Sequence, residues 1–241
     1  MSAAPLVFLC WRWKPDRGYR SQFPPSSIAV LHAMLSRHYH APFELLCITD
    51  EPDQVPAGVR RLKLWDDFTR IPSPHGQGYP SCYRRLKMFS REARDFIGPR
   101  FVSLDLDIVI TGNVTELFDQ PYEFRMYGDT AKGTPYNGSI VQHIAGTRAE
   151  VWEKFDPRLS PRAGLAKRYI GSDQAWIAVC LGPDEPKFTP KDGVFRYRNE
   201  IRPRGGALPA SARMVIMHGH HDPWDWHILQ RHSWLREHYR L

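Results

Sequence analysis

An apolar run at residues 101–110 is interrupted by two aspartates, Asp105 and Asp107, and this pair limits how the segment can fold. A buried, unpaired carboxylate is costly, and two ionised carboxylates so close together repel each other. If the run is one extended strand, positions i and i+2 face the same side, so both side chains can bind one divalent cation. Carboxylate oxygens suit Mn²⁺ or Mg²⁺. The alternative is a strand end, where one aspartate caps the next turn and the other pairs with a basic residue.

Short apolar segments alternate with amphipathic segments along the first half of the chain. We expect buried strands at residues 6–10, 43–49 and 101–110, a helix capped by Ser26 or Ser27, and a second helix at residues 82–97. This alternation predicts an α/β fold of Rossmann-like type, with a mostly parallel central sheet flanked by helices. In such sheets, ligands bind beyond the carboxyl ends of the strands.

The length and composition favour one α/β domain over residues 1–241. We find no apolar run long enough for a transmembrane helix and no secretory signal at the start, so a cytoplasmic location is expected. Cys10, Cys47 and Cys180 lie in apolar runs and are expected in the core. The net charge of +7 indicates an anionic partner, such as a nucleotide diphosphate, an acidic membrane surface or DNA. The alternative is a solvated basic surface without a dedicated partner.

A second candidate metal ligand lies near the end of the chain. The apolar run at residues 214–217 is followed at once by His218 and Gly219. A neutral imidazole at the mouth of a buried strand is well placed to bind a metal, and the glycine permits a close backbone approach. The alternative is a core histidine satisfied by hydrogen bonds. His220 and His221 are adjacent and therefore point apart, which argues against a zinc site.

Several short motifs follow one another in an order that resembles a known family. They are Cys10-Trp11, residues 47–50, residues 85–89, Leu104-Asp105-Leu106-Asp107, residues 112–118, residues 136–141, residues 171–174, His218-Gly219 and Pro223-Trp224. Together they resemble the glycosyltransferase family 8-like group of retaining GT-A enzymes. The resemblance covers nearly the whole chain.

The resemblance implies a single GT-A domain, a metal site and a nucleotide-sugar donor, most simply a UDP-sugar. Its metal ligands for Mn²⁺ or Mg²⁺ would be Asp105, Asp107 and His218. Its donor-binding residues would be Cys10, Trp11, Tyr83, Arg85, Asp105, Leu106, Asp107, Gly219, Pro223 and Trp224. The residues around the transferred sugar would be Asn137, Asp173 and Gln174. Plain core packing is the alternative for Trp11 and Tyr83, and a helix N-cap is the alternative for Asp173.

One position departs from the family pattern. Asp222 stands where the family has a lysine that contacts the diphosphate. A nearby cation can replace that lysine, and the candidates are Arg84, Arg85, Lys87, Arg202 and Arg204. The departure also keeps open a non-catalytic nucleotide-sugar binding protein on the same fold.

The acceptor is less constrained by the sequence. A saccharide or lipid-linked glycan is expected, and the C-terminal stripe of Ile228, Leu235 and Tyr239 would then suit a membrane surface or simply pack on the domain. The alternative is a modified base of phage DNA, since Arg196, Arg198, Arg202 and Arg204 could neutralise phosphates.

Overall fold

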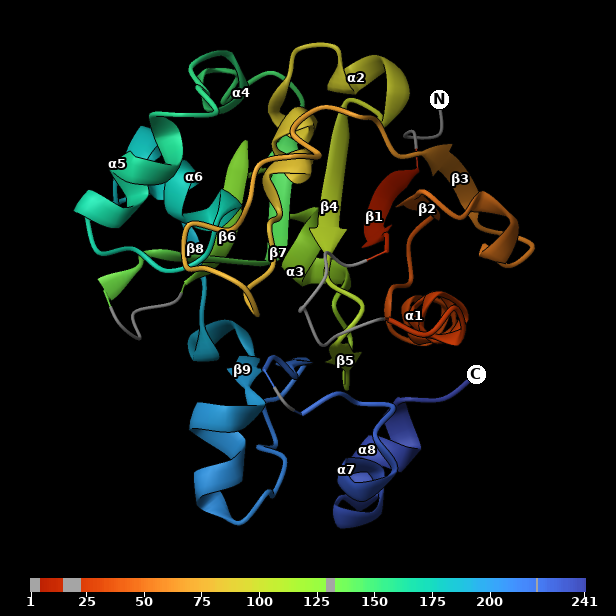
Figure 1. The fold of residues 1–241 in the computed structure, drawn as a ribbon. Helices are drawn as coiled ribbons and strands as arrows, with labels where there is room; N and C mark the ends of the chain where they lie inside the picture. The colour runs from red at the N-terminus through yellow and green to blue at the C-terminus, as the bar shows by residue number, and fades with distance from the viewer. Residues whose placement is uncertain (1–4, 15–22, 129–132, 220) are drawn as a thin grey trace.

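A computed structural model describes residues 5–14, 23–128, 133–219 and 221–241, which form two sheets with helices around them (Figure 1). The larger sheet has the strand order β3 (Arg60–Lys63), β2 (Phe43–Thr49), β1 (Leu6–Arg12), β4 (Arg100–Leu104), β7 (Tyr136–Ile144), β6 (Phe124–Gly128) and β8 (Lys187–Phe188). The smaller sheet has the order β5 (Ile108–Ile110), β10 (Met214–Ile216) and β9 (Val194–Arg196).

The helices of the described residues are mostly short. The α-helices are α1 (Ser26–His38), α2 (Ala93–Phe96), α3 (Thr115–Asp119), α4 (Glu150–Glu153), α5 (Ser160–Ala166), α6 (Asp173–Leu181), α7 (Trp226–Arg231) and α8 (Ser233–His238). The 3₁₀-helices are η1 (Pro52–Gln54), η2 (Tyr83–Phe89), η4 (Pro190–Asp192) and η6 (Arg202–Arg204), and η5 (Tyr197–Ile201) is a π-helix. None of the described helices has the length and apolar composition needed to cross a bilayer.

Successive side chains of β1 point to opposite faces of the large sheet and join a different apolar cluster on each face. Leu6, Phe8 and Cys10 belong to the apolar cluster that includes α1. Val7, Leu9 and Trp11 belong to the cluster on the other face, which includes η2 and α6. Two buried faces explain why β1 is apolar from Leu6 to Trp11. The predicted α/β layers with a mostly parallel sheet are confirmed.

Helix α1 lies where it was expected, but its predicted serine cap is wrong. Pro25 occupies the N-cap position and no side chain caps the helix. The Ser27 hydroxyl donates a hydrogen bond back to the Pro24 carbonyl at 2.7 Å, inside the first turn. The proline therefore starts the helix, because its fixed φ is already close to helical.

The strand order fixes where a ligand can bind. The chain runs outward from β1 to β2 and β3, and then returns to place β4 on the other side of β1. Strands β1 and β4 are parallel, so their carboxyl ends meet at this reversal of direction. A crevice forms at such a point because the connections leave in opposite directions. Trp11 lies near the end of β1, and Asp105 directly follows β4.

The single helix predicted at residues 82–97 is wrong in detail. The segment forms η2, then an extended residue at Ser90, and then the short α2. With three residues per turn, Tyr83, Leu86 and Phe89 share one buried face. Arg85 and Met88 share a second buried face.

The single strand predicted at residues 101–110 is also wrong. Strand β4 ends at Leu104, residues 105–107 form a turn, and β5 begins at Ile108 in the smaller sheet. The two carboxylates therefore sit at the junction of the sheets rather than within a buried strand. This corresponds to the alternative that placed a strand end at Asp105.

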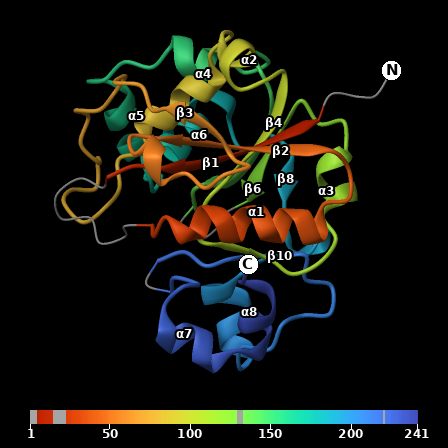
Figure 2. The ribbon, with the colours of Figure 1, turned by 90° about the vertical axis from the view of Figure 1, so that its right-hand side faces the viewer.

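The C-terminal third closes the other side of the molecule. Figure 2 shows α1 lying between the large sheet and the segment that carries α7 and α8. Ile228 and Leu235 are buried in the same apolar cluster as Phe8 and the strands of the small sheet. The C-terminal stripe thus packs onto the domain, which was the simpler of its two interpretations.

Candidate active site

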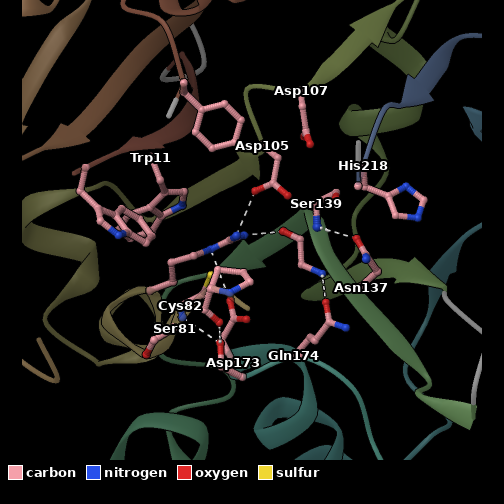
Figure 3. Close-up of a pocket in the computed structure, with 18 residues that line it drawn as sticks. Trp11, Ser81, Cys82, Asp105, Asp107, Asn137, Ser139, Asp173, Gln174 and His218 are labelled. Carbon is pink, nitrogen blue, oxygen red and sulfur yellow. Dashed lines mark hydrogen bonds and ion pairs between the residues drawn. The ribbon is translucent and has the colours of Figure 1, made fainter. Parts of the chain in front are cut away.

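A cavity of about 200 Å³ opens at the carboxyl ends of β1 and β4 (Figure 3). Its walls come from seven segments of the chain. The lining residues are Trp11, Trp13, Phe23, Pro80, Ser81, Cys82, Arg85, Asp105, Asp107, Asn137, Gly138, Ser139, Gly171, Ser172, Asp173, Gln174, His218 and Gly219. The cavity therefore collects most of the predicted site residues.

The guanidinium of Arg85 lies at the centre of the cavity's charged groups. Its Nη1 donates a hydrogen bond to Asp105 Oδ1 at 2.9 Å, and its Nε lies 3.4 Å from Asp173 Oδ2. Its Nη2 donates to the Gly138 carbonyl. Burial disfavours the charged form, but Asp105 and Asp173 outweigh it and raise the pKa of Arg85. Arg85 is thus a fixed positive charge shared by two carboxylates.

The turn after β4 presents Asp105 and Asp107 to the cavity (Figure 3). The backbone N–H of Asp105 donates to the Ser139 carbonyl of β7 at 2.9 Å, which anchors the turn. Asp107 Oδ1 is buried and has no hydrogen-bond partner among the described residues. Burial, followed by the charges of Asp105 and Asp222, raises the pKa of Asp107 well above its usual range. A divalent cation bound here would satisfy the orphaned oxygen and offset the repulsion.

His218 lines the same cavity but does not complete a metal site in this conformation. In the view of Figure 3 its ring is turned to the side away from Asp105. Within residues 5–14, 23–128, 133–219 and 221–241, no three His, Cys, Asp or Glu side chains form a ready-made metal cluster. The two aspartates fit a hard cation, whereas binding by His218 requires its side chain to rotate.

The N-terminal end of α6 forms the wall opposite β4. Ser172 is the N-cap residue of α6, and no side chain makes a capping hydrogen bond, so the N-cap interpretation of Asp173 is wrong. Asp173 is 4% exposed, and burial raises its pKa despite the nearby Arg85. Gln174 Oε1 accepts the Gly138 N–H at 3.2 Å, and Asn137 Oδ1 accepts the Ser139 N–H at 2.9 Å. These bonds fix both amides at the cavity wall.

Aromatic rings form the remaining side of the cavity. Trp11 is nearly buried, and its Nε1 donates to Ser103 Oγ at 2.8 Å. Trp13 and Phe23 line the cavity beside it. The Trp11 and Trp13 rings meet edge to face, with centroids 6.3 Å apart. An apolar ring surface next to a charged wall suits a ligand that combines a flat base with phosphates.

Five predicted donor-binding side chains do not line the cavity. Cys10 and Leu106 point into the core cluster around α1. Tyr83 is buried in the opposite cluster, with its ring centroid 5.0 Å from that of Phe155. Pro223 is buried, and Trp224 stands behind Phe23 with ring centroids 5.4 Å apart. Cys10 alternates with Trp11 along β1, so its side chain faces the other way. Leu106 lies in the turn between Asp105 and Asp107, and its side chain is buried in the core cluster.

The structure adds residues to the site that were not predicted. These are Trp13, Phe23, Pro80, Ser81 and Cys82, together with the neighbours Gly138, Ser139, Gly171 and Ser172 of predicted residues. The two-residue spacing of Trp11 and Trp13 in an extended segment could have indicated Trp13. No sequence signal indicates Phe23, which is brought in by the hydrogen bond from Arg12 Nε to its carbonyl at 2.9 Å.

The candidate replacements for the missing lysine separate clearly. Among the described residues, Arg85 is the one of these five candidates that lines the cavity. Arg84 Nε donates to the Trp65 carbonyl at 3.1 Å, and Lys87 pairs with Asp67 at 2.7 Å. Arg202 lies beside His221, and Arg204 is exposed.

No protein-family model matches the sequence, and no curated protein sequence is significantly similar to it. Solved structures are nevertheless similar in fold. The galactosyltransferase LgtC, in complex with donor and acceptor sugar analogs, aligns with a TM-score of 0.63 and 11% identity over 98% of this chain and 97% of that chain. The glycosyltransferase GlyE of Streptococcus pneumoniae TIGR4 aligns with a TM-score of 0.57 and 11% identity, covering 97% of this chain and 63% of GlyE.

A third similar structure is the bifunctional glycosyltransferase WbbM, with a TM-score of 0.58 and 14% identity. The match covers 97% of this chain but 51% of WbbM, so this chain spans about half of that protein. These similarities confirm the expected GT-A-type α/β fold.

Proposed function

We propose that the protein is a glycosyltransferase that moves a sugar from a nucleotide-sugar donor, most simply a UDP-sugar, to a saccharide or lipid-linked acceptor. The observation that carries this proposal is the convergence of Asp105, Asp107 and the buried Arg85 in a cavity at the switch point of the sheet. That cavity lies in a fold shared with LgtC, whose structure contains donor and acceptor sugar analogs.

The residues divide into three roles in this proposal. Trp11, Trp13 and Phe23 offer ring surface for the base of the donor. Asp105 and Asp107, with His218 after rotation of its side chain, would hold Mn²⁺ or Mg²⁺. A divalent ion bound there would neutralise the charge that develops on the leaving diphosphate. Arg85 holds Asp105 in position and adds a fixed positive charge to the same wall.

The remaining wall is suited to the transferred sugar. Asp173 and Asn137 present acceptors and donors for hydroxyl groups, and Gln174 fixes the Gly138 backbone beside them. Asp173 is also a candidate to orient the acceptor or to act as a nucleophile in a double displacement. By its resemblance to the retaining group, the chain would keep the anomeric configuration of the donor sugar. NMR analysis of the product's anomeric proton tests this, and an inverted product would contradict it.

The first experiment is donor hydrolysis with a panel of UDP-, GDP- and CMP-sugars, each with Mn²⁺ and with Mg²⁺. Turnover of one donor would identify base, sugar and metal together. Binding without turnover would instead favour a non-catalytic nucleotide-sugar binding protein.

A variant tests the metal assignment directly. Asp107→Asn keeps the side-chain shape and removes the charge, so we expect turnover to fall by about 100-fold or more at saturating Mn²⁺. The control is Asp53→Asn, because Asp53 is an exposed residue of η1 outside the cavity. Mn²⁺ affinity, measured by electron paramagnetic resonance, should fall in the first variant alone. Near-normal turnover and Mn²⁺ affinity in Asp107→Asn would refute the assignment.

The DNA alternative has a separate test. Arg198 and Arg204 are exposed and could contact phosphates, whereas Arg196 pairs with Glu200 at 3.6 Å. Binding to a DNA duplex should then weaken steeply with salt. A gel-shift titration that shows no complex at low salt would remove this alternative.

A further inference from the structure

Two leucines are exposed at α5, one at its N-cap and one within the helix, where a soluble helix normally places polar residues. Leu159 is 64% exposed and Leu165 is 44% exposed. The inner face of the helix is formed by Ser160 and Gly164, which are buried. Figure 1 shows α5 outermost on its side of the molecule, with α6 between it and the sheet. The two leucines therefore contribute to a solvent-facing surface rather than to the core.

Four cations surround these leucines, and one of them, Arg158, lies near the carboxylate of Asp156. Arg158, Arg162, Lys167 and Arg168 are exposed, and no ion pair within 4.0 Å involves any of them among the described residues. The acidic side chain of this segment is Asp156, whose Oδ1 accepts the backbone N–H groups of residues 158 and 159 at 2.7 and 2.8 Å. The surface is thus both apolar and strongly positive.

Arg168 occupies a backbone position that ordinarily favours glycine. Its φ is +58°, in the left-handed region, at the end of α5. The N–H of Tyr169 bonds to the Gly164 carbonyl at 3.0 Å, and that of Arg168 bonds to the Leu165 carbonyl at 2.8 Å. Such a helix end is usually completed by glycine, because a side chain is disfavoured there. An arginine at this position adds a cation to the surface at a cost in backbone strain.

We propose that this surface, the α5 patch (Arg158, Leu159, Arg162, Leu165, Lys167 and Arg168), seats the protein on an anionic lipid bilayer. Exposed leucines insert among acyl chains, and cations bind anionic headgroups. A nucleic acid would use the cations but would gain little from the leucines. The patch therefore fits a lipid surface better than DNA.

The patch lies next to the sugar side of the cavity. Tyr169 and Ile170 connect it to Gly171, which lines the cavity with Ser172 and Asp173. A bilayer under α5 would bring the cavity close to lipid headgroups. Resting on the proposed function, this geometry favours a lipid-linked saccharide as the acceptor.

The test is sedimentation of the full chain with vesicles of equal parts phosphatidylglycerol and phosphatidylcholine, compared with pure phosphatidylcholine. We expect binding to the anionic vesicles only, weakened by salt because the charges are screened. Leu159→Ser combined with Leu165→Ser should lower the partition coefficient by about tenfold or more. Arg168→Gly should lower it by about fivefold.

The Arg168→Gly variant distinguishes a loss of vesicle binding from a loss of folding. Arg168→Gly relieves the left-handed strain, so its melting temperature should equal or exceed that of the wild type. The matched control is Arg198→Gln, an exposed arginine outside the patch, which should bind vesicles as the wild type does. Absence of binding to anionic vesicles at low salt, equal binding by all variants, or binding to a DNA duplex in place of vesicles would each overturn the proposal.

Donor hydrolysis in vesicle-free solution keeps the two proposals distinguishable. The patch variants should hydrolyse donor at the wild-type rate, because none of the altered residues lines the cavity. Vesicle binding by a protein that turns over no donor would refute the proposed function and leave the patch intact.

Discussion

At the level of single side chains, Arg85 determines whether the cavity's carboxylates can be buried together. It is 5% exposed and contacts both Asp105 and Asp173. Arg85→Met would leave these carboxylates without a counter-charge, so we expect the free energy of unfolding to fall by about 3 kcal/mol. Urea denaturation at neutral pH measures this change.

A neighbouring ion pair provides the control for Arg85. Lys87 lies on the same 3₁₀-helix as Arg85 and pairs with Asp67, but the side chains of Lys87 and Asp67 are both about one-third exposed. Lys87→Met should therefore change stability by less than about 1 kcal/mol. Adding Asp173→Asn to Arg85→Met should recover part of the loss, because one buried charge is then removed. Equal stability of the two single variants would show that the buried network contributes nothing.

His143 gives the fold a specific response to acid. Both ring nitrogens are buried among Phe89, Phe101 and Phe124 and have no hydrogen-bond partner in the described part of the chain. Burial lowers its pKa from 6.5 to about 3. Below pH 6.5 the unfolded chain binds a proton that the folded chain does not, so stability falls as pH drops from 6.5 towards 3. His143 contributes up to about 1.4 kcal/mol per pH unit to the dependence of the free energy of unfolding on pH.

His143→Phe removes this titration. We expect the free energy of unfolding to depend less on pH between 6.5 and 4 than it does in the wild type, with little difference in slope above pH 7. Denaturation series across this range measure the slopes. Parallel curves for the wild type and His143→Phe would contradict the assignment.

At the level of secondary-structure elements, two glycines with the same backbone conformation differ only in their surroundings. Gly193 has φ 81° and ψ 17°, and Gly205 has φ 73° and ψ 8°. A methyl group on Gly193 would overlap the backbone oxygen of Ser211, whereas one on Gly205 would meet nothing within 4 Å. The contrast separates backbone strain from steric overlap.

We therefore expect Gly205→Ala to lower the free energy of unfolding by about 1 kcal/mol, the cost of a left-handed alanine. Gly193→Ala should cost about 2 kcal/mol more, because β9 must shift away from the Ser211 segment. Guanidinium denaturation of both variants measures the difference. Equal losses of unfolding free energy in the two variants would mean that the Ser211 segment moves away from the new methyl group without a measurable cost in stability.

Elements that are determined by the residue pattern within their own segment could be predicted, whereas elements that depend on contacts with distant segments could not. The bounds 43–49 of β2 and the position of α1 follow from apolar periodicity, and both are confirmed. The 3₁₀-helix η2 buries Arg85 against Asp105, a contact between residues 20 positions apart. No period in the sequence reports such a contact, so the segment was predicted as one helix.

The same reasoning applies to the site. Asp105, Asp107, Asn137, Asp173 and Gln174 could be identified because each belongs to a short motif, and the structure brings them to one cavity. Phe23 and Pro80 reach the cavity through loops whose course is set by tertiary contacts. Cys10 and Leu106 were assigned through their neighbours, although strand and turn geometry directs their side chains into the core.

Across the entire chain, the two sheets share one apolar cluster. It includes Phe8 of β1, Val109 of β5, Val215 of β10 and Leu235 of α8. A shared core couples the stabilities of the parts that it joins, and the single domain over residues 1–241 stays a prediction that this coupling makes testable. That prediction has a direct thermodynamic consequence.

We expect one cooperative unfolding transition, with coincident curves from far-ultraviolet circular dichroism and tryptophan fluorescence. Leu235→Ala opens a cavity beneath the small sheet, and Leu46→Ala opens one in the cluster on the other face of the large sheet. Each should lower the free energy of unfolding by about 2–5 kcal/mol and move both curves together, because β1 contributes side chains to both clusters and joins them. If the small sheet and C-terminal helices were instead an independent unit, Leu235→Ala would split off an earlier transition, whereas Leu46→Ala would shift only the later one.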